Sequence, residues 1–211
     1  MNNKCYQKKT GILGGTFNPI HVGHLILAQN AMEACGLDKV IFIPSGCSYL
    51  KDPKEVAETK HRVAMTALAI KNNERFELST IESDREGDSY TYETLCILKN
   101  SEPDTHFYYI VGADTLLYME NWKKPEEIFD KCTVVCAKRD GHSGEVLKQK
   151  AEYLKERFGA DIIIMDVEET NVSSSMIRIL LADGKSCRYY LDDAVSDYIK
   201  ENALYRANPA E

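Results

Sequence analysis

The sequence predicts an α/β fold in a single domain, residues 1–211, with a doubly wound, mostly parallel sheet and a small C-terminal helical part. Short β-rich runs alternate with helical patterns almost from end to end, which is typical of a parallel sheet with helices on both faces. Several of the β-rich runs are continuously apolar, as expected for strands buried on both sides. A chain of 211 residues is also long enough for one domain with a well-formed core.

Six segments have the composition of strands, because they are short and rich in apolar and β-branched residues. In chain order the expected strands are Lys9–Leu13, Val40–Ile43, Phe76–Ile81, Phe107–Val111, Thr133–Ala137 and Ile162–Met165.

Helices are expected between these strands, where apolar residues recur every three or four positions. Glycines follow two of the patterns and are typical helix ends. The apolar positions are Leu25, Ala28, Met32 and Cys35 before Gly36; Val63, Ala67 and Ile70; and Leu147, Ala151, Leu154 and Phe158 before Gly159.

Charge and composition exclude several classes of protein. The chain has 26 basic and 33 acidic side chains, a net charge of −7, which disfavours non-specific binding of nucleic acid. No apolar run is long enough to cross a membrane, and the polar segment Met1–Thr10 does not resemble a signal peptide. The seven cysteines form no C-x-x-C pair, which favours a reduced, cytoplasmic protein.

The most informative segment, G-G-T-F-N-P-I-H-V-G-H-L, covers residues 14–25 between the first expected strand and the first expected helix. Glycines at this turn allow the backbone to approach a ligand closely. The N-terminus of the helix offers unpaired N–H groups that attract phosphate. His21 and His24 lie on one face if the turn is already helical, where they can donate hydrogen bonds to charge that develops during a reaction.

A second anion-binding pattern, V-S-S-S-M-I-R, occupies residues 172–178. A serine N-cap begins a helix here, and Gly184 ends it. Ser174 and Ser175 lie on the same side as Arg178, which can fork onto a phosphate. Two anion-binding helix starts in one fold suit a triphosphate, which is longer than one such site.

Together the two motifs resemble the H-x-G-H nucleotidylyltransferase superfamily and, more closely, the bacterial nicotinate-nucleotide adenylyltransferase family. The resemblance implies a Rossmann-like nucleotidylyltransferase fold and an enzyme of NAD biosynthesis that makes nicotinate adenine dinucleotide and pyrophosphate from ATP and nicotinate mononucleotide. It also implies Mg²⁺ bound through the ATP phosphates and no metal ligands from the protein. Further segments that resemble the family are Ser89–Thr91, Tyr109–Asp114, Asn121–Lys123, Val134–Arg139 and Val195–Tyr205.

The resemblance also implies the site residues. The attacking phosphate is already an anion, so catalysis needs positioning and charge stabilisation rather than a protein base. The implied catalytic residues are His21, His24 and Arg178. The implied ATP-binding residues are Gly14, Gly15, Thr16, Phe17, Gly112, Asp114, Arg139, Ser174 and Ser175. The implied pyridine nucleotide-binding residues are Lys51, Tyr90, Thr91 and Trp122, with Trp122 stacking on the nicotinate ring.

Two positions depart from the family pattern. Asn18 stands where the family usually has aspartate. The loop after the second strand usually contains Pro-Pro-His-Lys, but here reads S-G-C-S-Y-L-K over residues 45–51. That loop lies near the pyridine nucleotide in the family, so nicotinamide mononucleotide or another phosphate acceptor such as phosphopantetheine remains an alternative substrate. A non-catalytic nucleotide-binding regulator is a second alternative, and the oligomeric state is left open, a homo-oligomer included.

Overall fold

The computed structural model describes residues 8–46, 56–85, 87–138, 144–167 and 171–206. The chain divides into two compact units. Unit 1 contains residues 1–14, 27–41 and 89–169, and unit 2 contains residues 15–26, 42–88 and 170–211. The two units are described separately below.

The described residues form a six-stranded sheet with the order β3-β2-β1-β4-β5-β6. The pairs β1–β4, β4–β5 and β5–β6 are parallel. The order reverses between β1 and β4, which is the point where ligands bind in doubly wound sheets. The predicted α/β class is therefore confirmed. The strands are β1 Lys8–Gly15, β2 Lys39–Pro44, β3 Phe76–Leu78, β4 Thr105–Gly112, β5 Cys132–Lys138 and β6 Asp161–Asp166.

The apolar runs of β1, β2, β4 and β5 form the buried centre of the sheet, as predicted, whereas that of the edge strand β6 is only partly buried, with Ile163 37% exposed. Val134 and Val135 of β5 are both 0% exposed. The third strand is shorter than expected, because it ends at Leu78 and residues 81–84 form a turn instead of continuing the strand. Ser83 and Asp84 favour that turn: the Ser83 hydroxyl donates to the carbonyl of Thr80, and the Asp84 carboxylate accepts from the Thr80 hydroxyl.

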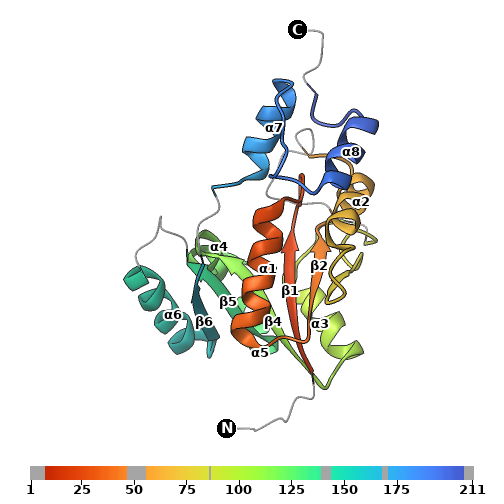
Figure 1. Cartoon of the computed structure of the whole chain (residues 1–211). Coiled ribbons are helices and arrows are strands. Elements are labelled where there is room, and N and C mark those ends of the chain that lie inside the picture. Colours follow the sequence, from red (N-terminus) through yellow and green to blue (C-terminus); the bar gives the residue numbers. More distant parts are fainter. Residues whose placement is uncertain (1–7, 47–55, 86, 139–143, 168–170, 207–211) are drawn as a thin grey trace. The chain divides into compact units, whose positions relative to one another are not determined.

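Helices of unit 1 cover the strands that this unit contains. Helix α6 lies beside β6 (Figure 1) and also packs against α4, while α3 packs against α5. Leu147 and Leu154 of α6 are fully buried, as their spacing predicts. The elements that lie wholly in unit 1 are α3 Thr91–Ser101, α4 Ala113–Tyr118, the 3₁₀ turn η2 Met119–Asn121, α5 Pro125–Lys131 and α6 Gly144–Phe158. Helix α1, Val22–Cys35, begins in unit 2 and ends in unit 1.

Unit 2 contains α2 Thr59–Ile70, α7 Ser174–Ala182 and α8 Asp193–Glu201. Helix α2 packs against β3 and against α8, beside which it lies in Figure 1. The Asp192 carboxylate caps α8 by accepting from the N–H of Ala194 at 2.9 Å. Helices α7 and α8 are the small C-terminal helical part that the sequence predicts.

No helix among the described residues is long and apolar enough to cross a membrane. The prediction that residues 1–211 form a single domain stays a prediction.

Candidate active site

The motif loop, residues 16–21, connects β1 to α1 within unit 2. Phe17 has a left-handed backbone, with φ of 48°, and its side chain is 2% exposed. Its ring packs edge-on against His24, with ring centroids 5.1 Å apart and planes at 86°. The buried Phe17 ring therefore anchors the loop from within and fixes the imidazole that the sequence places in the site.

His21 and His24 lie together at the start of α1. Their ring centroids are 3.8 Å apart, and the backbone N–H of His21 donates to Nδ1 of His24 at 3.2 Å. Because Nδ1 accepts this bond, the proton of a neutral His24 lies on Nε2. Nε2 of His24 is thus a hydrogen-bond donor.

Asn18 is a buried junction, 3% exposed, at the centre of the motif loop. Its side-chain oxygen accepts from the N–H of Ala57 at 3.0 Å and from the hydroxyl of Tyr205 at 2.8 Å. Burial raises the pKa of Tyr205 well above its usual range, so the hydroxyl keeps the proton that it donates. A neutral amide makes these two bonds without burying a charge, which gives a physical reason for asparagine at this departure from the family pattern.

The first turn of α7 bonds directly to the motif loop. Ser173 caps the helix, accepting from the N–H of Met176 at 3.1 Å, as predicted. The Ser174 hydroxyl donates to the carbonyl of Pro19 at 2.9 Å. Arg178 donates through Nη1 to the carbonyl of Asn18 at 3.0 Å.

Nη2 of Arg178 makes a longer contact of 3.4 Å with the hydroxyl of Ser175. The structure therefore brings the two sequence motifs together within unit 2. Their residues in this group are Gly15, Thr16, Phe17, His21, His24, Ser174, Ser175 and Arg178.

The other expected residues lie in unit 1, where Tyr109 contacts two of them. The Tyr109 ring is T-shaped against Trp122, with centroids 6.1 Å apart. Its hydroxyl lies 3.4 Å from the hydroxyl of Thr91, the first residue of α3. Trp122 is partly exposed, which leaves ring surface for a ligand.

Lysines cover the tyrosines on either side of Thr91. Nζ of Lys123 lies 3.8 Å from the centroid of the Tyr90 ring, and Nζ of Lys124 lies 4.6 Å from that of Tyr92. These cation–π contacts join the segment that carries Thr91 to the segment that carries Trp122.

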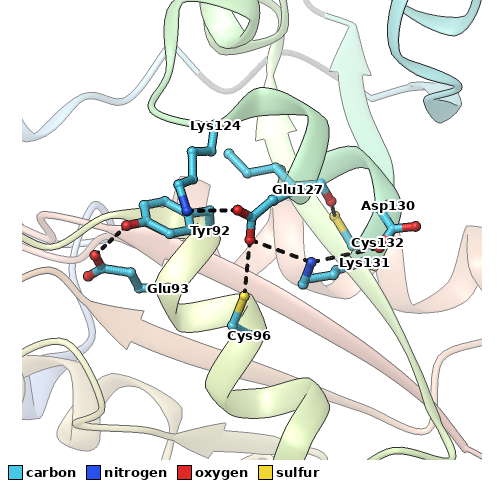
Figure 2. Close-up of polar contacts among 9 residues, drawn as sticks. Tyr92, Glu93, Cys96, Lys124, Glu127, Asp130, Lys131 and Cys132 are labelled. Carbon is cyan, nitrogen blue, oxygen red and sulfur yellow. Dashed lines mark hydrogen bonds and ion pairs between the residues drawn. The ribbon is translucent and has the colours of Figure 1, made fainter.

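A polar network continues that connection between α3 and α5, as Figure 2 shows. The Glu127 carboxylate lies between Lys124, at 2.8 Å, and the thiol of Cys96, at 3.6 Å. Its hydrogen bond with Lys124 lowers the pKa of Glu127, and burial raises the pKa of Cys96. The thiol therefore stays protonated and can donate, and the network fixes how α3 and α5 approach each other.

Gly14, Gly112 and Asp114 lie at the carboxyl ends of β1 and β4 in unit 1. Asp114 is exposed, in the first turn of α4. Gly14 has no room for a side chain, because an added Cβ would lie 2.9 Å from the Tyr109 hydroxyl. Lys51 and Arg139 lie outside the described residues. In the described part of the chain, no group of three His, Cys, Asp or Glu side chains could hold a metal ion.

Three residues that bond to the site were not among the predicted site residues. Arg62 donates to the carbonyl of Thr16, Tyr109 contacts Thr91 and Trp122, and Tyr205 donates to Asn18. Only Arg62 left a usable signal: it recurs with Met65 and Thr66 at helical spacing on the apolar face of α2, where a charge is unusual.

The amino-acid sequence of the chain is similar to those of known proteins. A model of the cytidylyltransferase-like family matches residues 12–179. A relative from Lachnoclostridium phytofermentans, named a probable nicotinate-nucleotide adenylyltransferase, is 42% identical over 198 residues, which are 94% of this chain and 99% of the relative. A relative from Thermoanaerobacter sp. with the same name is 39% identical over 94% of both chains.

Solved structures show the same fold at lower identity. Plasmodium falciparum nicotinic acid mononucleotide adenylyltransferase complexed with NaAD has a TM-score of 0.78 and 21% identity, with 94% of this chain and 97% of that chain covered. The same protein complexed with APC has a TM-score of 0.75 at the same identity and coverage.

Proposed function

The chain belongs to the cytidylyltransferase-like family and, within it, to the nicotinate-nucleotide adenylyltransferases, and we propose on that premise that it joins ATP to nicotinate mononucleotide. The products are nicotinate adenine dinucleotide and pyrophosphate, a step of NAD biosynthesis. The phosphate of the mononucleotide attacks the α-phosphorus of ATP, and the bond from that phosphorus to the pyrophosphate oxygen breaks.

Residues of unit 2 bind and stabilise the phosphates in this proposal. Nε2 of His24 donates to the charge that grows on the α-phosphate in the transition state, assisted by His21. The backbone of residues 15–17 and the Thr16 side chain hold the α-phosphate region. Arg178 takes the β- and γ-phosphates with Ser174 and Ser175. Arg178 bonds to the Asn18 carbonyl and to Ser175, so its guanidinium is prepositioned for the phosphates.

Residues of unit 1 bind the acceptor and the rest of ATP. Trp122 stacks on the pyridine ring of the acceptor, because two flat aromatic rings pack well against each other. Backbone N–H groups of the first turn of α3, at Thr91, meet the nicotinate carboxylate. Tyr90 and Lys51 complete the acceptor side, while Gly112, Asp114 and Arg139 bind ATP.

Mg²⁺ bound through the ATP phosphates would lower the charge that the leaving pyrophosphate carries in this proposal. It prefers oxygen ligands and keeps several of its waters, which suits attachment through phosphates. The substrates, ATP and nicotinate mononucleotide, are the partners, and the cytoplasm is the proposed compartment. Burial raises the pKa of Cys132 and of Cys136 to about 12, so both stay protonated as thiols.

The observation that carries the proposal is the direct bonding of α7 to the motif loop. Ser174 donates to the carbonyl of Pro19, and Arg178 donates to the carbonyl of Asn18. This bonding supports a shared phosphate site of α7 with His21 and His24 within unit 2, as transfer from a triphosphate requires.

Release of pyrophosphate tests the proposal. The protein is incubated with ATP, Mg²⁺ and one acceptor at a time: nicotinate mononucleotide, nicotinamide mononucleotide or phosphopantetheine. We expect the highest kcat/KM with nicotinate mononucleotide and no release without an acceptor. Binding of ATP without release of pyrophosphate in the presence of any of these acceptors would identify a regulator instead of an enzyme.

A further inference from the structure

Arg62 is an almost completely buried arginine, 1% exposed, on the apolar face of α2. Its guanidinium donates hydrogen bonds to several described groups of unit 2. Nε donates to the carbonyl of Ala57 at 3.0 Å and Nη1 to the carbonyl of Thr16 at 2.9 Å. Nη2 donates to the carbonyl of Gly46 at 3.0 Å and to the hydroxyl of Thr59 at 2.9 Å. One side chain thus joins the motif loop, the end of β2 and the start of α2.

The bond to Thr16 fixes a peptide group of the motif loop. In a planar trans peptide the carbonyl and the following N–H point in opposite directions. Holding the Thr16 carbonyl toward Arg62 therefore directs the N–H of Phe17 away from Arg62. The carbonyl of Gly15 is held in the same way by the N–H of Ser45 at 2.9 Å, which directs the N–H of Thr16.

Two successive N–H groups are thus given fixed directions by donors behind the loop. Runs of oriented backbone N–H groups form anion-binding concavities in phosphate sites. Their value depends on position, because preorganised donors lose no free energy to reorganisation when charge develops. A buried guanidinium on the carbonyl of Thr16 also polarises that peptide, which strengthens the N–H of Phe17 as a donor.

Stability alone gives a poor reason for an arginine here. Burying a guanidinium is costly, and an apolar side chain of similar volume often serves a helix core as well or better. The neighbours that α2 buries alongside Arg62 include Met65, which is 0% exposed. The planar fork of arginine reaches three carbonyls at once, whereas lysine offers a single point charge.

We propose that Arg62 is a positioning residue for adenylyl transfer, which holds the Thr16–Phe17 peptide so that its N–H is presented to the α-phosphate of ATP. It touches no substrate and acts through the motif loop. Its bond to Gly46 holds the end of β2 in register with that loop. The inference rests on the proposed function, since it assigns the phosphate that the loop receives.

The test compares Arg62→Met and Arg62→Lys with Met65→Ala, a matched variant that damages the same helix face without removing a bond to the loop. Steady-state kinetics are measured well below each melting temperature. We expect both Arg62 variants to lose about 10- to 100-fold in kcat/KM for ATP, with a smaller change in KM for the mononucleotide. Met65→Ala should lower the melting temperature and keep kcat/KM within about threefold of the wild type.

Equal kinetic loss in Met65→Ala and in the Arg62 variants would overturn the proposal, because it would reduce Arg62 to a residue that merely stabilises α2. If Arg62→Met fails to fold, Arg62→Lys decides the question, because it keeps the charge and loses the fork. A loss of less than about threefold in kcat/KM for ATP in Arg62→Lys would also overturn the proposal.

Failure of the proposed function would be visible separately. In that case the wild-type protein would release no pyrophosphate from ATP, whichever acceptor is added. The rise in melting temperature on adding ATP would then test Arg62 alone: we expect a rise in the wild type and in Met65→Ala, and a much smaller one in Arg62→Lys. An equal rise in all three would contradict the role of Arg62.

Discussion

At the scale of single residues, His24 combines the bonding and position that catalysis by charge stabilisation requires. Its Nδ1 is occupied by the N–H of His21 at 3.2 Å, so Nε2 carries the proton of the neutral ring. We predict that His24→Ala lowers kcat by about 10²–10³-fold, the usual effect of removing one transition-state donor. Initial rates of pyrophosphate release measure this.

The control for His24→Ala is His106→Gln, which alters a histidine at the start of β4 in unit 1, outside the proposed catalytic set. Circular dichroism should show that both variants are folded, and His106→Gln should keep near-normal turnover. A folded His24→Ala protein with near-normal kcat would remove His24 from the mechanism.

Gly14 leads to a second prediction at this scale. A Cβ at Gly14 would lie 2.9 Å from the hydroxyl of Tyr109, which is 8% exposed. The backbone φ of Gly14 is not in the positive region. Crowding by the Tyr109 hydroxyl, and not backbone strain, therefore opposes alanine at this position. We predict that Gly14→Ala costs about 1–3 kcal/mol of unfolding free energy through overpacking.

Adding Tyr109→Phe should recover at least about 1 kcal/mol of that loss, because it removes the obstructing oxygen. Urea unfolding of the two single variants and the double variant measures this coupling. Gly112→Ala is the matched control, since nothing lies within 4 Å of a Cβ there. Strictly additive effects of Gly14→Ala and Tyr109→Phe would show that the contact does not constrain residue 14.

What the sequence predicts at this scale depends on whether the chemistry is local. The serine cap of α7 and the pair His21 and His24 follow from a few adjacent residues, and they were found. Arg62 and Tyr205 act on residues 46 and 187 positions away. A charge on the apolar face of α2 marks Arg62 as unusual, but no local pattern encodes which distant residue either side chain contacts.

At the scale of elements, the sheet of unit 1 has a polar ladder across the starts of three strands. Nε2 of His106 in β4 lies 2.7 Å from the hydroxyl of Thr133 in β5, and that hydroxyl donates to the carboxylate of Asp161 in β6 at 2.6 Å. The single hydroxyl proton goes to Asp161, so Thr133 accepts from His106 and the neutral ring carries its proton on Nε2.

This ladder predicts a pH dependence of stability. Desolvation, and then the charge of Lys99, lower the pKa of His106, while Asp161 partly opposes them. A histidine whose folded pKa lies below its unfolded value of about 6.5 stabilises the fold fully above that pH. The contribution falls as the pH drops below about 6.5, because the unfolded chain then binds the proton more readily.

We therefore expect the urea midpoint of the wild type to fall more between pH 7 and pH 5.5 than that of His106→Gln. Glutamine can keep a donor toward Thr133 and cannot take up the proton. Parallel titration curves for the two proteins would show that His106 does not contribute.

Elements also differ in how far periodicity alone predicted them. The strands β4 and β5 are nearly continuous apolar runs. Each observed strand extends one or two residues beyond its predicted ends. The third strand was predicted to reach Ile81 but ends at Leu78, because hydrogen bonds of Thr80 with Ser83 and Asp84 close a turn. Side-chain bonds of this kind compete with strand pairing and leave no trace in an apolar pattern.

At the scale of the whole molecule, a chain of net charge −7 is proposed to bind two anionic nucleotides. Long-range repulsion works against that binding, so local positive groups must provide the attraction. In unit 2, Arg178 and the start of α7 are positive groups at the motif loop. In unit 1, Lys123 and Lys124 lie over the tyrosines that flank Thr91, next to the N-terminus of α3. Positive groups therefore lie beside the segments to which the proposal assigns the anionic ligands, although Glu127 pairs with Lys124.

The acceptor preference follows from that distribution. The carboxylate of nicotinate would meet charge-assisted donors at Thr91, whereas the amide of nicotinamide makes weaker bonds and leaves donors unmatched. Trp122 offers its ring equally to both pyridines and cannot distinguish them. We predict that kcat/KM for nicotinate mononucleotide exceeds that for nicotinamide mononucleotide by at least about tenfold, or roughly 1.4 kcal/mol.

Parallel kinetics with the two mononucleotides at saturating ATP measure the ratio, and Trp122→Phe provides the control. That variant keeps an aromatic face, so it should raise KM for both acceptors by a similar factor and leave their ratio unchanged. The altered segment at residues 45–51 is the feature of this chain that departs most from its family pattern on the acceptor side. Equal kcat/KM values, or a preference for the amide, would mean that this segment and not the start of α3 decides which pyridine is used.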